Sequence, residues 1–104
     1  LRSYEFDGAA GFAKMNRIMN DLRGGIASFG GADVKELIDY AKGVDSLPKA
    51  DVLKFVLDGN SSIVVRPSGT EPKLKVYFTV SAENAAAASA TEARIAADVE
   101  KHLK

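Results

Sequence analysis

The groups best suited to binding an anion lie in residues 66 to 73, which read RPSGTEPK. Gly69 can adopt backbone angles that turn successive N–H groups inward, and Ser68 and Thr70 add hydroxyl donors. Arg66 can donate two parallel N–H bonds to phosphate oxygens, because its planar guanidinium matches their geometry. These residue types therefore suit a site that holds one phosphate group.

The residues around this loop strengthen that interpretation but leave an alternative open. Pro67 and Pro72 fix two backbone angles, so the loop should lose less entropy when a ligand binds. The charged neighbours leave a local positive excess of two, namely Arg66, Lys73 and Lys75 against Glu71. The same residue types are ordinary in turns, so a rigid hairpin turn beside solvated lysines is the alternative.

Composition restricts the classes of partner. The chain has 104 residues, with 14 Lys plus Arg and 14 Asp plus Glu, so its formal net charge is zero. A protein that binds nucleic acid mainly through phosphate neutralisation usually has a basic excess, and no apolar run reaches the roughly 18 to 20 residues of a membrane helix. We therefore expect no nucleic-acid and no membrane partner. The absence of cysteine fits a reducing compartment, and we expect a cytoplasmic protein.

The first half of the chain predicts one clear helix. Apolar residues spaced by three and four predict a helix at about 8 to 22, with Asp7 as N-cap and Gly24-Gly25 as its stop. The residues of this apolar stripe are Phe12, Met15, Ile18, Met19 and Leu22. Residues 33–41 are compatible with a helix or a strand, and residues 42–51 read as a polar connection.

The second half predicts three strands and a final helix. Residues 52–57 and 63–65, joined by turn residues 58–61, indicate a hairpin. Residues 73–80 alternate strictly and predict the clearest strand, with Leu74, Val76, Phe78 and Val80 on one face. Residues 84–103 predict a long helix whose apolar stripe is Ile95, Val99 and Leu103. One α+β domain, residues 1–104, accounts for these elements.

The loop resembles a known motif. Residues 66–73, followed by LKVY at 74–77, closely resemble the phosphate-binding loop in the C-terminal domain of the α-D-phosphohexomutase superfamily, the phosphoglucomutases and phosphomannomutases. The resemblance extends upstream through VLKFVLDGNSSIVV at 52–65, and the element order covers essentially the whole chain. PKADVLKF at 48–55 is more similar to bacterial phosphoglucomutases than to phosphoglucosamine mutases.

The resemblance implies a fold. It predicts a TATA-box-binding-protein-like domain with an antiparallel sheet of about four strands and two helices packed on it. Residues 33–41 would then form a strand. The fold name does not imply DNA binding, because function follows the site and not the architecture.

The resemblance also implies an activity for a longer protein. Its members interconvert hexose 1-phosphates and 6-phosphates through a phosphoserine enzyme and a bisphosphate intermediate, so the implied substrates are glucose 1-phosphate, glucose 6-phosphate and glucose 1,6-bisphosphate. Mg²⁺ is held in another domain, outside residues 1–104. The C-terminal domain holds the phosphate that is not being transferred, and its partners are the other three domains of the same chain.

Residue roles carry over position by position. The resemblance implies direct phosphate contacts from Arg66, Ser68, Gly69 and Thr70. Lys75, which stands where many relatives have arginine, is a candidate additional contact. Loop-shaping roles fall to Pro67, Glu71, Pro72 and Lys73.

Several parts of a complete enzyme are missing from the sequence. It contains no catalytic-serine motif, no Asp-Gly-Asp metal cluster and no sugar-selecting loop. We therefore expect no catalytic and no metal-binding residue in this chain, and interpret it as an excised C-terminal domain that is inactive alone. The alternatives are a phosphomannomutase or other member of the superfamily, a non-catalytic phosphate-binding or phosphopeptide-binding module, and a purely structural domain.

Overall fold

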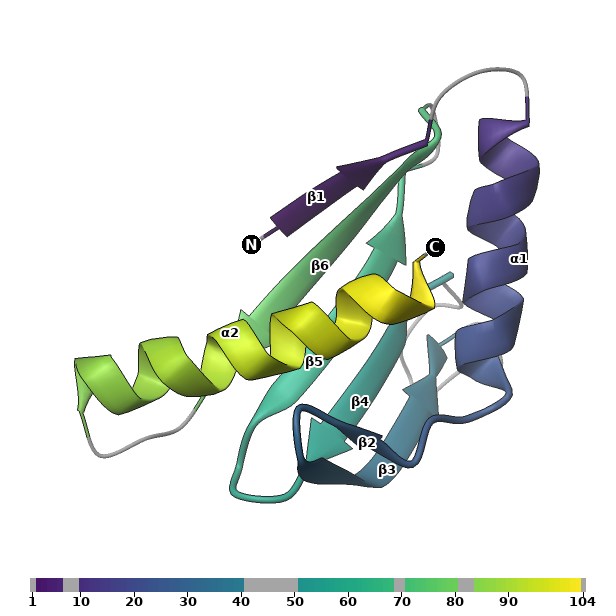
Figure 1. Ribbon diagram of the computed structural model, residues 1–104. Helices are drawn as coiled ribbons and strands as arrows, with labels where there is room; N and C mark the ends of the chain where they lie inside the picture. Colours follow the sequence, from purple (N-terminus) through teal and green to yellow (C-terminus); the bar gives the residue numbers. More distant parts are fainter. Residues whose placement is uncertain (1, 7–9, 41–50, 69–70, 81–83, 104) are drawn as a thin grey trace.

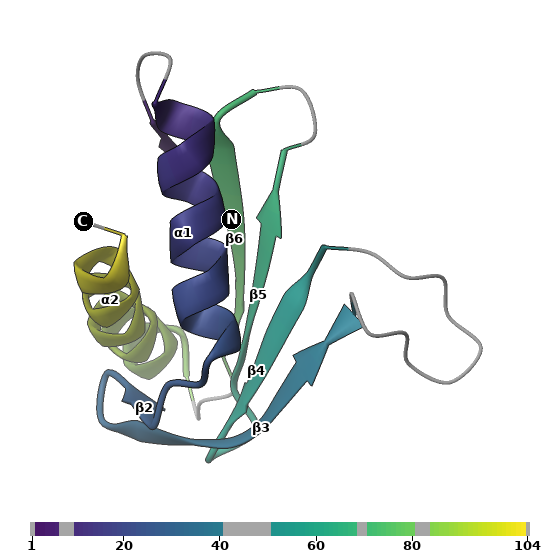
Figure 2. The ribbon, with the colours of Figure 1, turned by 90° about the vertical axis from the view of Figure 1, so that its right-hand side faces the viewer.

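One antiparallel sheet carries two helices on the same face (Figures 1 and 2). The structure, a computed structural model, describes residues 2–6, 10–40, 51–68, 71–80 and 84–103. The strands are β1 (Arg2–Glu5), β2 (Ser28–Phe29), β3 (Ala32–Asp39), β4 (Leu53–Leu57), β5 (Ser62–Pro67) and β6 (Lys73–Thr79). The helices are α1 (Gly11–Arg23) and α2 (Ala85–His102).

The sheet confirms the expected α+β class and corrects its strand count. Its six strands have the order β1-β6-β5-β4-β3-β2, and all neighbours are antiparallel. The four central strands include the one that the resemblance implied at 33–41, and this arrangement is compatible with the TATA-box-binding-protein-like fold. The two extra strands lie at the edges. With 4 and 2 residues, β1 and β2 are too short to show a readable alternation, and they form by pairing with longer neighbours.

The predicted first helix is confirmed with shifted bounds. Helix α1 begins at Gly11, and its N-cap is Ala10, which makes no side-chain capping bond. The expectation of Asp7 as N-cap is therefore wrong, and Asp7 itself lies outside the described residues. The helix ends at the predicted stop, where Gly24 is the C-cap and Gly25 has a φ of 104°.

Most of the predicted helix stripe is buried. The buried members are Met15, Ile18, Met19 and Leu22. Phe12, the first member of the predicted stripe, is 42% exposed and does not belong to the core, contrary to what the stripe predicts. Phe12 lies on the first turn of α1, one residue after the buried Gly11.

The predicted hairpin and third strand are confirmed. In β4 and β5, Leu53 pairs with Val65 and Phe55 with Ile63, and all four side chains are buried under the helices. Leu74 and Val76 of β6 are buried on the same face, as the alternation predicted. Residues 42–50 of the predicted polar connection at 42–51 lie outside the described residues.

Helix α2 closes the core. The side chain of Asn84 accepts the Ala87 backbone N–H at 2.8 Å and caps the helix. Its predicted stripe is buried, namely Ile95, Val99 and Leu103. Below it, Phe29 packs edge-on against Phe55, with ring centroids 5.1 Å apart. The two helices and one sheet face thus enclose a single apolar cluster.

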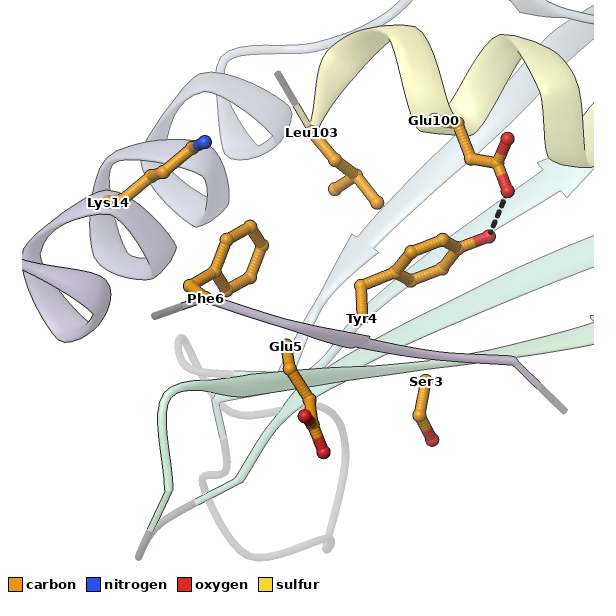
Figure 3. A pocket seen from close by; sticks show the side chains of 7 residues that line it. All are labelled: Ser3, Tyr4, Glu5, Phe6, Lys14, Glu100 and Leu103. Carbon is orange, nitrogen blue, oxygen red and sulfur yellow. Dashed lines mark hydrogen bonds between the residues drawn. The ribbon is translucent and has the colours of Figure 1, made fainter. Parts of the chain in front are cut away.

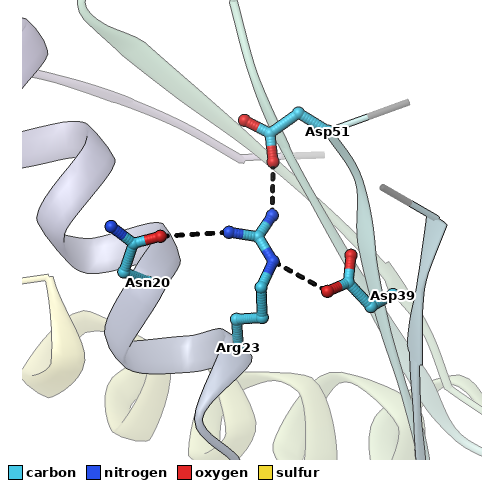
Figure 4. A network of polar contacts seen from close by, with 4 residues as sticks. All are labelled: Asn20, Arg23, Asp39 and Asp51. Carbon is cyan, nitrogen blue, oxygen red and sulfur yellow. Dashed lines mark hydrogen bonds and ion pairs between the residues drawn. The ribbon is translucent and has the colours of Figure 1, made fainter. Parts of the chain in front are cut away.

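Arg23 at the end of α1 joins three segments (Figure 4). Its Nε donates to Asp39 Oδ2 at 2.8 Å and its Nη2 to Asp51 Oδ1 at 2.6 Å, while Nη1 donates to Asn20 Oδ1 at 3.2 Å. Burial lowers the pKa of Arg23, but the two carboxylates outweigh it and raise this pKa above its ordinary value. One guanidinium therefore links α1 to the end of β3 and to the residue two positions before β4.

The two carboxylates on Arg23 should differ in their contribution to stability. The Asp39 side chain is 8% exposed and that of Asp51 is 50% exposed. We expect Asp39→Asn to lower the free energy of unfolding by about 1–3 kcal/mol, and Asp51→Asn by at most about 1 kcal/mol. Urea unfolding of both variants tests this. An equal loss from the two substitutions would contradict it.

The close approach of Gly30 to α2 generates a second prediction. Gly30 has a φ of 57°, and a Cβ on it would lie 2.7 Å from the Ile95 backbone nitrogen. Gly31 has a φ of 84° with nothing within 4 Å of its Cβ position, so it is a matched control. We expect Gly31→Ala to cost about 1–2 kcal/mol of unfolding free energy through backbone strain, and Gly30→Ala about 1–3 kcal/mol more through the clash. Equal losses would refute the contact.

Candidate functional site

Two cations lie side by side at one end of the sheet. Arg66 of β5 is paired directly with Lys75 of β6, next to the buried pair Val65 and Val76. Because side chains alternate along strands, the burial of the valines turns Arg66 and Lys75 to the outer face, the sheet face away from α1 and α2. Directly opposed residues have Cβ atoms about 4.5–5.5 Å apart, and like charges at that separation repel.

No carboxylate balances this pair in the described part of the chain. The ion pairs found there join other residues, and none includes Arg66 or Lys75. Arg66 is exposed and Lys75 is half-buried. Their repulsion would be relieved by an anion bound between them, and the planar fork of arginine suits a phosphate or carboxylate.

The β5–β6 loop, residues 68–72, begins beside this pair. The Ser68 backbone N–H donates to the Lys73 carbonyl at 2.8 Å, and the Lys73 N–H donates to the Glu71 carbonyl at 2.8 Å. The first bond holds the two ends of the loop together, and the second closes a tight turn at its C-terminal end. Gly69 and Thr70, two of the predicted phosphate contacts, lie outside the described residues.

The structure thus brings Arg66, Ser68 and Lys75 to the same end of β5 and β6. Among the predicted loop-shaping residues, Glu71 is exposed, while Pro67 and Pro72 are half-buried beside the loop ends. Pro67 is the last residue of β5 and pairs with Leu74, on the helix side of the sheet. The predicted residues that the structure describes therefore lie close together in space as well as in sequence.

Sequence reasoning missed the partner of Lys73. The Lys73 Nζ lies 3.8 Å from Glu5 Oε1, because β1 pairs with β6 and places Glu5 opposite Lys73. The local positive excess therefore falls from two to one, and Lys73 contributes less to the field at the loop. No pattern in the four residues of β1 signalled this pairing.

A separate cavity of about 440 Å³ lies beside β1 (Figure 3). It is lined by Ser3, Tyr4, Glu5, Phe6, Lys14, Glu100 and Leu103. None of these is a predicted phosphate contact, and Lys14 lies over the Phe6 ring, 5.5 Å from its centroid. The loop end with its unbalanced cations is the better candidate for an anion site, because charge and donor geometry select an anion more strongly than cavity volume does.

Tyr4 and Glu100 form a polar contact at this cavity. The Tyr4 hydroxyl donates to Glu100 Oε1 at 3.2 Å, and Arg2 Nη1 lies 4.0 Å from the same oxygen. Burial raises the pKa of Tyr4, and the charge of Glu100 and its hydrogen bond raise it further. These contacts tie β1 to the last turns of α2.

The described ranges contain neither a metal-binding cluster nor a membrane-spanning helix. Among these residues, no three or more His, Cys, Asp or Glu side chains gather where they could hold a metal ion. The described helices also include none that is long and apolar enough to cross a membrane.

Comparison with known proteins gives one consistent family. The family described as "Phosphoglucomutase/phosphomannomutase, C-terminal domain" matches residues 9–102. A phosphoglucomutase of Staphylococcus saprophyticus is 37% identical over 91 residues, which cover 76% of this chain and 16% of that protein. A phosphoglucomutase of Staphylococcus epidermidis is 33% identical over 96 residues, which cover 81% of this chain and 17% of that protein.

A third relative carries another description. A probable phosphomannomutase of Haemophilus influenzae is 34% identical over 67 residues, which cover 64% of this chain and 13% of that protein. The chain spans less than a fifth of the length of each of these relatives.

The Tyr4–Glu100 contact predicts a loss of stability at alkaline pH. The folded state holds the Tyr4 proton more tightly than the unfolded state, whose pKa is near 10.0. Stability from this contact is therefore fully present below pH 10.0 and is lost as the pH rises through the raised pKa.

The free energy of unfolding, measured between about pH 9 and pH 12, where tyrosines titrate, should show this decline. Tyr4→Phe should make the decline shallower, because it removes the group that titrates. Tyr77→Phe, at an exposed tyrosine on β6, is the control. If Tyr77→Phe alone flattened the decline, the assignment to Tyr4 would be wrong.

Proposed function

The chain belongs to the phosphoglucomutase/phosphomannomutase C-terminal domain family, and on that premise we propose that it is the substrate-phosphate-binding domain of a longer phosphohexomutase. One observation carries the proposal, namely the Arg66 and Lys75 pair on the outer face, which no described carboxylate balances. A protein gains nothing in stability from two opposed cations, so their placement beside the loop favours a role in binding an anion.

The proposed site holds a phosphate by charge and by directed donors. Arg66 donates two parallel N–H bonds to phosphate oxygens, and Lys75 supplies a second positive charge from the adjacent strand. The hydroxyls of Ser68 and Thr70 and the backbone at Gly69 complete the set. Two positive charges match the charge of a phosphate monoester at neutral pH, whose second pKa is about 6.

The proposed role in catalysis is positioning. The site grips the phosphate that does not react, so the sugar is oriented with its other oxygen toward the phosphoserine of another domain. A cradle that recognises only phosphate accepts either end of glucose 1,6-bisphosphate. The intermediate can therefore turn between the two half-reactions and present each end in turn. Mg²⁺ would be bound elsewhere in the longer chain, where it would neutralise charge on the transferring phosphoryl group.

The proposed substrates are glucose 1-phosphate and glucose 6-phosphate, which follow the names of the Staphylococcus relatives. Mannose phosphates are the second candidate, because the Haemophilus relative is described as a probable phosphomannomutase. A phosphate cradle does not distinguish the sugars, so we assign sugar selection to the other domains. We also place the protein in the cytoplasm, where sugar phosphates are found.

A titration of the 104-residue chain tests the proposed site. Inorganic phosphate or glucose 1,6-bisphosphate should shift the backbone amide signals of residues 66, 68, 69, 70 and 75, since Pro67 has no amide proton. Arg66→Ala should weaken binding by roughly 10- to 100-fold, since a hydrogen bond to a charged group contributes about 1.5–3 kcal/mol. Arg66→Lys should recover only part of the loss, because it keeps the charge without the fork.

A matched control separates this site from a general charge effect. Arg17→Ala removes the same charge from an exposed position on α1, in the helix layer. It should leave phosphate binding unchanged. Amide signals that do not respond at residues 66 and 68–70, or an equal effect of the two alanine variants, would reject the site. In the full-length protein Arg66→Ala should raise KM and lower kcat for glucose 1-phosphate.

A further inference from the structure

We propose that strand β1 and the first turn of α1 position the β5–β6 loop, here called the phosphate loop, through Phe6 and Gly11. On the outer face, Glu5 and Ser3 of the same strand determine how much positive charge Lys73 and Lys75 present to an anion. This inference rests on the proposed function and adds a part of the chain to it. Ser3, Glu5 and Phe6 precede residue 9, where the family match begins.

A three-way contact holds the end of the loop. Phe6, directly after β1, is 8% exposed, and its backbone N–H donates to the Pro72 carbonyl at 2.8 Å. Pro72 is the last residue before β6. In Figure 1 the end of β1, the start of α1 and the start of β6 meet at the same end of the sheet. Any shift of β1 along β6 would therefore move the Pro72 peptide.

Gly11 makes this contact possible. It is the first residue of α1 and is buried, and a Cβ on it would lie 2.5 Å from the Phe6 carbonyl oxygen and 2.9 Å from Pro72 Cβ. Only a residue without a side chain lets α1 approach both segments this closely. The ring of Pro72 fixes its φ, so displacement of Pro72 is transmitted to the neighbouring residue Glu71.

The same strand arranges the charges on the outer face. Figure 3 shows Ser3 and Glu5 on the side of β1 opposite to Tyr4 and Phe6, which point toward the helices. In the register of β1 and β6, Glu5 is opposite Lys73 and Ser3 is opposite Lys75. Glu5 therefore neutralises Lys73, whereas the neutral Ser3 leaves the charge of Lys75 available to a bound anion.

Strand β1 is held from the other side by α2. Tyr4 donates to Glu100, and Arg2 lies 4.0 Å from the same carboxylate. The position of the loop thus depends on contacts that reach from the N-terminal strand to the last helix. In a longer chain, β1 would be the segment through which the preceding part of the protein connects to the phosphate loop.

The mechanical part is tested by Gly11→Ala, with Gly24→Ala as control. Gly24 caps the same helix with a φ of −69°, and its Cβ position lies 3.3 Å from the nearest atom, Asp21 O. We expect Gly11→Ala to weaken binding of inorganic phosphate about tenfold, since small displacements of positioning groups have large effects. Hydrogen exchange of the Ser68 amide, measured without phosphate, should become faster. Gly24→Ala should change neither.

The electrostatic part is tested by Ser3→Glu, with Ser62→Glu as control. Both serines lie on the outer face, but Ser62 is four residues from Arg66 along β5, roughly 13 Å away and beyond the Debye length of about 8–10 Å. Ser3→Glu should weaken phosphate binding about three- to tenfold at low salt, with a smaller effect at high salt. Ser62→Glu should have little effect.

The outcomes separate this inference from the proposed function. If the unsubstituted chain does not bind phosphate, the proposed function fails, and the positioning role is then judged by Ser68 exchange alone. A folded Gly11→Ala chain with unchanged exchange would overturn the positioning role, and equal effects of the two glutamates would overturn the charge arrangement. If Gly11→Ala does not fold, Pro72→Gly is used in its place, because this substitution removes both the Pro72 Cβ that faces Gly11 and the restraint on the φ of residue 72. Unchanged hydrogen exchange of the Ser68 amide in that variant would also overturn the positioning role.

Discussion

The register between β5 and β6 is the constraint on which the candidate site depends. Successive side chains of a strand point to opposite faces, so one register determines both faces at once. The register that buries Val65 against Val76 under the helices also places Arg66 beside Lys75 on the outer face. A shift of β6 by one residue would expose Val76 and turn Lys75 toward the core, away from Arg66. The hydrophobic core therefore holds two like charges together that would otherwise separate.

The layer arrangement explains why this pair is accessible. Both helices pack on one face of the sheet, so the outer face is not covered by any described element (Figure 2). At the loop end the sheet is broadened by β1, which pairs with β6 and brings Glu5 next to Lys73. The charge around the loop thus depends on residues far apart in the sequence, Glu5 and Lys73, which the antiparallel pairing of β1 with β6 brings together.

Much of this could be predicted because it depends on local pattern. The alternation in β6, the turn residues between β4 and β5, and the stripe at Ile95, Val99 and Leu103 are visible in short windows. The errors fall where a tertiary contact decides. Helix α1 begins at Gly11, where it packs against Phe6 and Pro72, and not at a polar cap. The two edge strands were missed because a strand of a few residues forms only against a partner.

The sequence by itself determined the residue types that can hold a phosphate, their order in one short loop, and the family to which the chain is similar. Only the tertiary structure decided which of the nearby cations remain unbalanced. Lys73 and Lys75 lie on the same strand face and are equivalent in sequence pattern, yet one is opposite Glu5 and the other opposite Ser3. That difference arises from pairing between residues about 70 positions apart, which no local window contains.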